Sequence, residues 1–179
     1  MEHITTFTGE DLTPVTPNAS QIHIKDIAHA LSLMCRANGH FKHFFSVAQH
    51  SINCAKEAKS RGLSERIQLA CLLHDASESY LSDITRPVKP HLPKYLEIEE
   101  GLQNAIYEKY LKTPLYEGEQ NQVKQIDDDM LVHEFNALMK KKVFDGLPQI
   151  KSSPSFEFVE FGKIENEFLN IFNERVADI

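Results

Sequence analysis

The chain has 179 residues, of which 41% are hydrophobic and 25% are charged, and its formal net charge is -7. This length and balance are typical of a soluble globule with a sizeable core, so we expect one domain over residues 1–179. The acidic charge argues against a nucleic-acid-binding protein, and no apolar run approaches the roughly 18 residues that span a bilayer.

Residues 1–20 are rich in Thr and Pro and are predicted to form a short irregular segment with a strand pair. Beyond them, apolar residues recur at helical spacing and are separated by Gly, Pro and Asn. The predicted helices are 26–36, 44–60, 64–81, 94–111, 121–143 and 156–176. The prediction is therefore an all-α helical bundle, with a core of about residues 20–145 and a C-terminal helix that closes it.

The first residues show neither the basic segment nor the hydrophobic segment of a secretion signal. The three cysteines have no disulfide-framework spacing, which suits a reducing compartment. We therefore expect a cytoplasmic protein whose cysteines are small buried side chains. The sequence is also compatible with a homodimer.

Two histidines lie at equal distances from a predicted helix boundary. Gly62 suits the end of one helix and Ser64 the start of the next, and His50 and His74 each lie twelve residues from Gly62. In an antiparallel helix hairpin, both histidines would lie about 18 Å from the turn and face each other. With Asp75 beside His74, they indicate a metal site, because such groups on an apolar stripe are costly unless paired or bound to a cation.

A further carboxylate ligand is expected on the fifth predicted helix, which contains Asp127, Asp128 and Asp129. Asp127 has Val123 four residues before it and Leu131 four residues after it, so it lies on the apolar stripe. Asp128 and Asp129 follow polar residues at the same spacing. We therefore predict that Asp127 binds the metal and that the other two lie on the solvated face.

Together these residues form the pattern His50, His74, Asp75 and Asp127. The pattern resembles the signature of the HD-domain phosphohydrolases, and residues 74–89 are similar to the 5′-deoxynucleotidase branch of that family. The resemblance covers about residues 5–145. It implies an HD-domain helical bundle in which these four residues bind one divalent metal ion, of which Co, Mn, Ni, Zn, Fe and Mg are all candidates.

The same resemblance implies roles for residues around the metal. Glu78 would be the catalytic base that accepts a proton from water, and Asp83 would be a second acid–base group or hold a sugar hydroxyl. Arg36, Lys89 and His40 would bind the substrate and its phosphate. The alternative for Arg36 is a cap at the end of the first predicted helix, and the alternative for Lys89 is an ordinary loop cation.

The implied function is hydrolysis of the 5′-phosphate of deoxyribonucleoside monophosphates to nucleoside and phosphate. One alternative is a deoxynucleoside triphosphate (tri/pyro)phosphohydrolase of the same fold. A second is a structural zinc module without enzymatic activity, with Cys54 and Cys71 joining the two histidines. A third is a helical interaction or ligand-binding protein with an inactive site. The sequence does not determine base, sugar, phosphate number or native metal.

Overall fold

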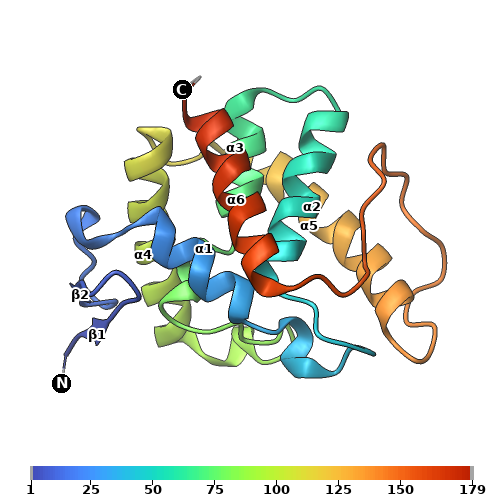
Figure 1. Ribbon diagram of the computed structural model, residues 1–179, viewed down its shortest axis with the longest axis horizontal. Coiled ribbons are helices and arrows are strands. Elements are labelled where there is room, and N and C mark those ends of the chain that lie inside the picture. Colours follow the sequence, from blue (N-terminus) through green and yellow to red (C-terminus); the bar gives the residue numbers. More distant parts are fainter. Residues whose placement is uncertain (1, 178–179) are drawn as a thin grey trace.

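The computed structural model describes residues 2–177, and it is built mainly from helices (Figure 1). Within these residues, the helices are α1 (Ile24–Leu33), α2 (Val47–Ser60), α3 (Glu65–Leu73), α4 (Pro93–Leu111), α5 (Glu117–Leu138) and α6 (Phe161–Val176). The strand β1 (Ile4–Thr5) pairs antiparallel with β2 (Asp11–Leu12). The predictions of an all-α class and of a short N-terminal strand pair are confirmed. In the described part of the chain, no helix combines the length and apolar character needed to cross a membrane.

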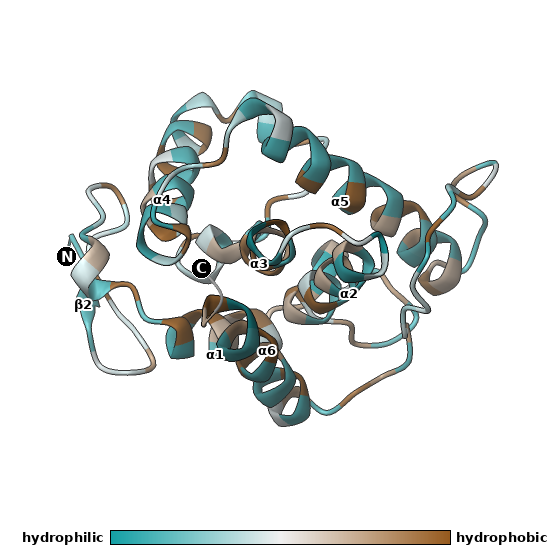
Figure 2. Cartoon of the chain, turned by 90° about the horizontal axis from the view of Figure 1, so that it is seen from above, coloured by the Kyte–Doolittle hydropathy of each residue, from teal (hydrophilic) through white to brown (hydrophobic). Residues whose placement is uncertain are grey.

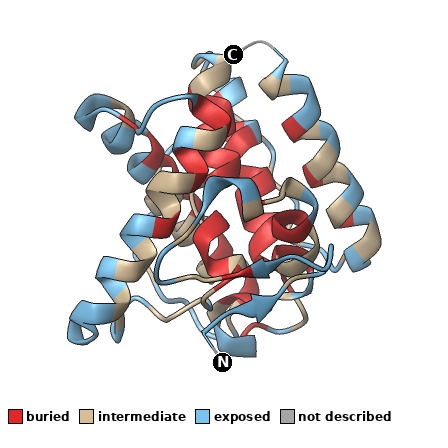
Figure 3. Ribbon diagram, turned by 90° about the vertical axis from the view of Figure 1, so that its left-hand side faces the viewer, coloured by how far each residue is buried: buried red, intermediate tan, exposed pale blue. Residues whose placement is uncertain are grey.

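Helix α3 occupies the middle of the bundle, and the other helices surround it (Figure 2). Its residues from Ile67 to Leu73 are all buried, which is the pattern of a helix covered on every side. Helix α6 instead buries one stripe, formed by Ile164, Phe168 and Phe172. Buried positions accordingly gather in the interior, while the outer helix faces are exposed (Figure 3). The end of α3, which carries His74, is therefore held inside the molecule.

Helix α3 ends at Leu73, so the prediction of one continuous helix over 64–81 is wrong. A 3₁₀ helix, Ala76–Ser79, follows after a break. In a continuing helix the Cys71 carbonyl would accept the amide four residues later. Here His74 Nδ1 donates to that carbonyl at 2.8 Å instead. The side chain of the histidine thus replaces a backbone hydrogen bond at the point where the helix stops.

Gln103 of α4 stabilises this break from the other side. Its Nε2 donates to the Leu73 carbonyl at 2.7 Å, and its Oε1 accepts from the Ser77 amide at 3.1 Å. These are backbone groups that a helix end leaves without a partner. The break therefore depends on a side chain that is distant in sequence, and beyond it the Asp75 carboxylate lies 3.3 Å from His74 Nε2.

Helix α5 is displaced from its predicted range of 121–143. It begins earlier because the Glu119 carboxylate accepts the Tyr116 amide at 3.0 Å and so caps the first turn. It ends earlier because the Lys42 amide donates to the Leu138 carbonyl at 2.9 Å. The second contact comes from another part of the chain, and local sequence patterns do not report it.

The ends of α1 and α6 also differ from prediction. Helix α1 ends before Arg36, which the prediction places inside the helix, so a helix-capping role for this arginine is wrong. Helix α6 begins at Phe161 because the Glu160 carboxylate accepts the Lys163 amide.

Helix α2 binds the segment that connects α5 to α6. Its fully buried Glu57 accepts hydrogen bonds from the amides of Lys151 and Ser152, from the Ser152 hydroxyl and from Arg61 Nε, at 2.6–3.0 Å. Burial by itself raises the pKa of Glu57, but these donors outweigh it, so the pKa is lowered. The ionised carboxylate therefore holds this segment against α2.

We expect Glu57→Gln to destabilise the fold by about 1–3 kcal/mol at neutral pH, because an amide cannot accept from all of these buried donors. The lowered pKa means that Glu57 contributes stability above the ordinary glutamate pKa of about 4.3 and loses it as pH falls through the folded-state pKa. The difference between parent and variant in the free energy of unfolding, measured with urea, should therefore become smaller as the pH is lowered from about 7 to about 3. Glu167→Gln, which alters an exposed carboxylate paired with Lys56, is the control. A difference that grows toward low pH would contradict this role.

Candidate metal centre

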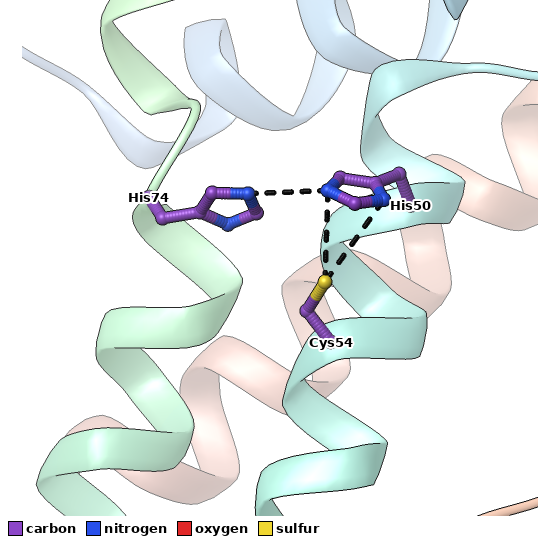
Figure 4. A group of neighbouring side chains, drawn as sticks. All are labelled: His50, Cys54 and His74. Atoms are coloured by element: carbon purple, nitrogen blue, oxygen red, sulfur yellow. Dashed lines mark hydrogen bonds between the residues drawn. The ribbon is translucent and has the colours of Figure 1, made fainter. Parts of the chain in front are cut away.

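His50 of α2 and His74 at the end of α3 face one another across the helix hairpin (Figure 4). Their Nε2 atoms are 3.2 Å apart. The His50 side chain is fully buried, and the His74 side chain is 9% exposed. The prediction that the two histidines meet at the same height of the hairpin is confirmed.

The other ring nitrogens are bonded to groups that can only accept. His50 Nδ1 donates to Glu134 Oε1 at 2.7 Å, and His74 Nδ1 donates to the Cys71 carbonyl. A neutral imidazole has one N–H, so when both rings are neutral their Nε2 atoms are unprotonated and face each other with lone pairs. Such a pair repels and requires a cation, either a proton or a metal ion. Burial and the charge of Arg36 lower the pKa of His50, but Cys54, Glu134 and the hydrogen bond to Asp127 outweigh them and raise that pKa, so the surroundings favour positive charge.

Two aspartates lie beside the histidine pair. Asp127 Oδ1 lies 3.2 Å from His50 Nε2 and 3.8 Å from His74 Nε2. Asp75 Oδ2 lies 3.3 Å from His74 Nε2 and 3.9 Å from His50 Nε2. Ligands held at about 2.0–2.2 Å from one ion are themselves separated by about 3.0–3.6 Å. All four atoms have metal-ligand chemistry, and the His50–His74, His50–Asp127 and His74–Asp75 distances fall within this range.

Cationic side chains lie against both carboxylates. Arg36 Nη1 lies 3.3 Å from Asp75 Oδ2, and Arg36 Nη2 lies 3.6 Å from Asp127 Oδ1. Arg86 Nη2 lies 3.0 Å from the other oxygen of Asp127. Burial raises the pKa of both aspartates, but the neighbouring histidines and Arg36 outweigh it, and both pKa values are lowered. Both aspartates are thus kept ionised, as metal ligands must be.

Cys54 lies one turn after His50 and forms, with the two histidines, a group that could hold a metal ion (Figure 4). Its Sγ is 3.6 Å from His50 Nε2 and 3.9 Å from Nδ1. An atom in line with the Nε2 lone pair would be much farther from Nδ1 than from Nε2. The sulfur therefore lies beside the ring and not along its metal-binding direction. In the described residues, Cys71 is not part of this group.

A cavity of about 300 Å³ adjoins the metal centre on the side of α4. It is lined by His74, Asp75, Ser77, Glu78, Lys89, Leu96, Glu99, Glu100 and Gln103. Carboxylates outnumber cations in this lining. The cavity therefore suits a ligand that presents hydrogen-bond donors beyond its metal-bound end.

Glu78 lies at the junction of this cavity and the metal centre and is 4% exposed. Its Oε1 accepts from Lys89 Nζ at 3.3 Å, and its Oε2 has no hydrogen-bond partner among the described residues. Burial raises the pKa of Glu78, the charges of Asp75 and Asp83 raise it further, and Lys89 only partly opposes them. A partly unpaired carboxyl group with a raised pKa is suited to proton transfer.

The chain is similar in sequence to two proteins that are described as uncharacterized. No family model matches the chain. The uncharacterized protein YfdR of Escherichia coli (strain K12) is 40% identical over 115 residues, which are 64% of this chain and 62% of YfdR. An uncharacterized protein of Rhodobacter capsulatus is 39% identical over 105 residues, which are 55% of this chain and 53% of that protein. The chain thus matches less than two thirds of the length of either relative.

His40, expected to bind substrate, is exposed, and in the described residues its side chain makes no hydrogen bond or ion pair with the candidate metal centre. Asp129, expected on the solvated face beside Asp128, is instead 8% exposed and accepts a hydrogen bond from Arg61 Nη2 at 2.7 Å. The reason is that this side of α5 packs against the end of α2, where Arg61 lies.

Glu134 is the residue of this centre that sequence reasoning misses. It is fully buried on α5, accepts the His50 Nδ1 hydrogen bond and also accepts from Arg36 Nε at 3.0 Å. It lies seven residues after Asp127, so the two share one face of the helix. That spacing is the signal that could have identified it.

Proposed function

We propose that this chain is an HD-domain metal-dependent phosphohydrolase that hydrolyses the 5′-phosphate of deoxyribonucleoside monophosphates to nucleoside and phosphate. The observation that carries the proposal is the convergence of two histidines and two aspartates beside a cavity that contains the buried, partly unpaired Glu78. The resemblance of residues 74–89 to the 5′-deoxynucleotidase pattern supports the same assignment. We also propose that the protein acts in the cytoplasm.

In this proposal His50, His74, Asp75 and Asp127 hold one divalent ion, which when bound supplies a Lewis acid for a phosphate oxygen and lowers the pKa of water. Glu78 accepts a proton from the attacking water through its free Oε2. Lys89 keeps that carboxyl group in place by its hydrogen bond to Oε1.

Two further groups act around the reacting phosphate. The Arg36 guanidinium offers a planar set of donors to phosphate oxygens and is already held within reach of both aspartates. Asp83 is the second acid–base group, and its pKa is raised, first by burial and also by the charge of Asp75, although Arg36 opposes the shift. A group of this kind can return a proton to the leaving oxygen.

The charges in the cavity favour a monophosphate over a triphosphate. Glu78, Glu99 and Glu100 line it together with one cation, Lys89, which is already 2.8 Å from Glu99. Additional phosphates would place more negative charge beside these carboxylates, whereas sugar hydroxyls and base amino groups would donate hydrogen bonds to them. We therefore place the nucleoside in this cavity.

A substrate panel tests the proposal. The purified protein is incubated with deoxynucleoside monophosphates, ribonucleoside monophosphates and deoxynucleoside triphosphates, each with Co, Mn, Ni, Zn or Mg. Inorganic phosphate released from the deoxynucleoside monophosphates is the expected result. Pyrophosphate or triphosphate released from the triphosphates, with monophosphates inert, would instead favour the triphosphohydrolase alternative. No product from any substrate with any metal would defeat the proposal.

A structural zinc module is the second candidate, because Cys54 groups with the two histidines. We expect Cys54→Ser combined with Cys71→Ser to retain the metal, since neither sulfur is needed for the ligand set of His50, His74 and two aspartates. Both thiols are buried, so a stability loss of about 1–2 kcal/mol is expected. Metal analysis and urea unfolding of the double variant measure both effects. A double variant that elutes without metal and folds poorly would favour the zinc module.

A further inference from the structure

Glu134 is a carboxylate of α5 that bonds two residues of the proposed site, His50 and Arg36. Its side chain is fully buried, and both of its oxygens are in use. Oε1 accepts from His50 Nδ1 at 2.7 Å, and Oε2 accepts from Arg36 Nε at 3.0 Å. One carboxylate from α5 therefore contacts a proposed metal ligand of α2 and the proposed phosphate-binding arginine that follows α1.

We infer that Glu134 is a positioning residue that orients His50 for the metal and Arg36 for the phosphate, an inference that rests on the proposed function. The bond to Nδ1 selects the tautomer of His50 in which Nε2 is free to bind a metal, and it fixes the plane of the ring. Ligand histidines are commonly held in this way by a carboxylate, and its loss weakens metal binding by about 10- to 100-fold.

The second contact of Glu134 determines how Arg36 is presented. Arg36 is only 10% exposed at its side chain, and its Nε is occupied by Glu134. Its Nη1 and Nη2 are thereby left facing Asp75 and Asp127, at 3.3 and 3.6 Å. The two terminal nitrogens of the guanidinium are therefore held beside the two carboxylates of the proposed metal site.

Only a carboxylate can make both contacts at once. Glutamine has one accepting oxygen and one donating amide nitrogen, so it can accept from His50 Nδ1 or from Arg36 Nε but not from both. Glu134→Gln keeps the size of the side chain while placing a donor against a donor on one side. The substitution therefore tests whether Glu134 orients His50 and Arg36 or only occupies volume in the interior.

The test is titration of the apo protein with Co²⁺ in competition with a chelator, followed by the visible spectrum of the bound ion. We expect Glu134→Gln to bind Co²⁺ about 10- to 100-fold more weakly than the parent and to change the spectrum, because the orientation of His50 is no longer fixed. Glu57→Gln is the matched control. Glu57 is also a fully buried glutamate with several donors, but it holds the segment between α5 and α6, so its variant should bind Co²⁺ as the parent does despite lower stability.

Equal Co²⁺ affinity and an unchanged spectrum in folded Glu134→Gln would overturn the inference, and so would equal weakening in Glu57→Gln. If Glu134→Gln does not fold, Glu134→Asp is titrated instead; it retains the charge but cannot reach both partners, and parent-like binding would again overturn the inference. A parent protein that binds no Co²⁺ overturns the inference and the metal centre together. A parent that binds Co²⁺ but hydrolyses no nucleotide defeats the proposed function alone, because this comparison does not use activity.

Discussion

Glu78→Gln should lower the turnover of deoxyribonucleoside monophosphates by about 10²–10⁴, the usual contribution of a general base. The amide retains the shape of the side chain but cannot accept a proton from water. The structure supports this large effect because Glu78 is buried, lines the cavity beside His74 and has an oxygen without a partner in the described residues. Phosphate release under saturating substrate measures the change.

Metal content separates this effect from a loss of the ion. Glu78 is not part of the ligand set, so Glu78→Gln should contain as much metal as the parent. Glu97→Gln, which alters an exposed glutamate of α4 paired with Lys94, should keep parent-like turnover. Should Glu78→Gln prove as active as the parent on every substrate, Asp83 would replace Glu78 as the candidate base.

Asp127→Ala should remove the metal and, with it, the phosphohydrolase activity. Its Oδ1 lies within 3.2 Å of His50 Nε2 and 3.8 Å of His74 Nε2, so the substitution deletes one of four converging ligands. The loss of affinity should exceed the about 10- to 100-fold effect of removing an outer partner of a ligand. Metal analysis after purification and Co²⁺ titration both measure it.

Asp128→Ala is the matched control, because Asp128 is the next residue of α5 but binds Arg86 and Lys124 on the outer side of the helix. It should keep its metal. Asp129→Ala should also keep the metal but lose stability, since it breaks the buried contact with Arg61. Equal metal retention in all three alanine variants would exclude Asp127 as a ligand.

The histidine pair was accessible from the sequence because its determinants are local. Cap residues around Gly62 define a short turn between two helices, and equal spacing from that turn then sets the height of His50 and His74. Helical periodicity likewise separates Asp127 from Asp128, because successive residues of a helix point in different directions. It also placed Asp129 on the solvated face, which is wrong, because the burial of Asp129 depends on the position of Arg61 at the end of α2.

Other features depend on contacts between distant segments. The break after Leu73 requires Gln103 of α4 to satisfy freed backbone groups, and no pattern in residues 64–81 reports that partner. The pairing of Arg36 with Glu134 spans 98 positions of the chain. Propensity and spacing describe one segment at a time, so contacts of this kind are outside their reach.

By itself, the sequence determined the all-α class, the N-terminal strand pair and the facing histidines, because helix periodicity and capping are properties of neighbouring residues. Only the tertiary structure decided where α3 stops, that Asp129 is buried and that Glu134 supports both His50 and Arg36. Each of these depends on which helix packs against which, and a buried polar group is stable only where that packing brings its partner.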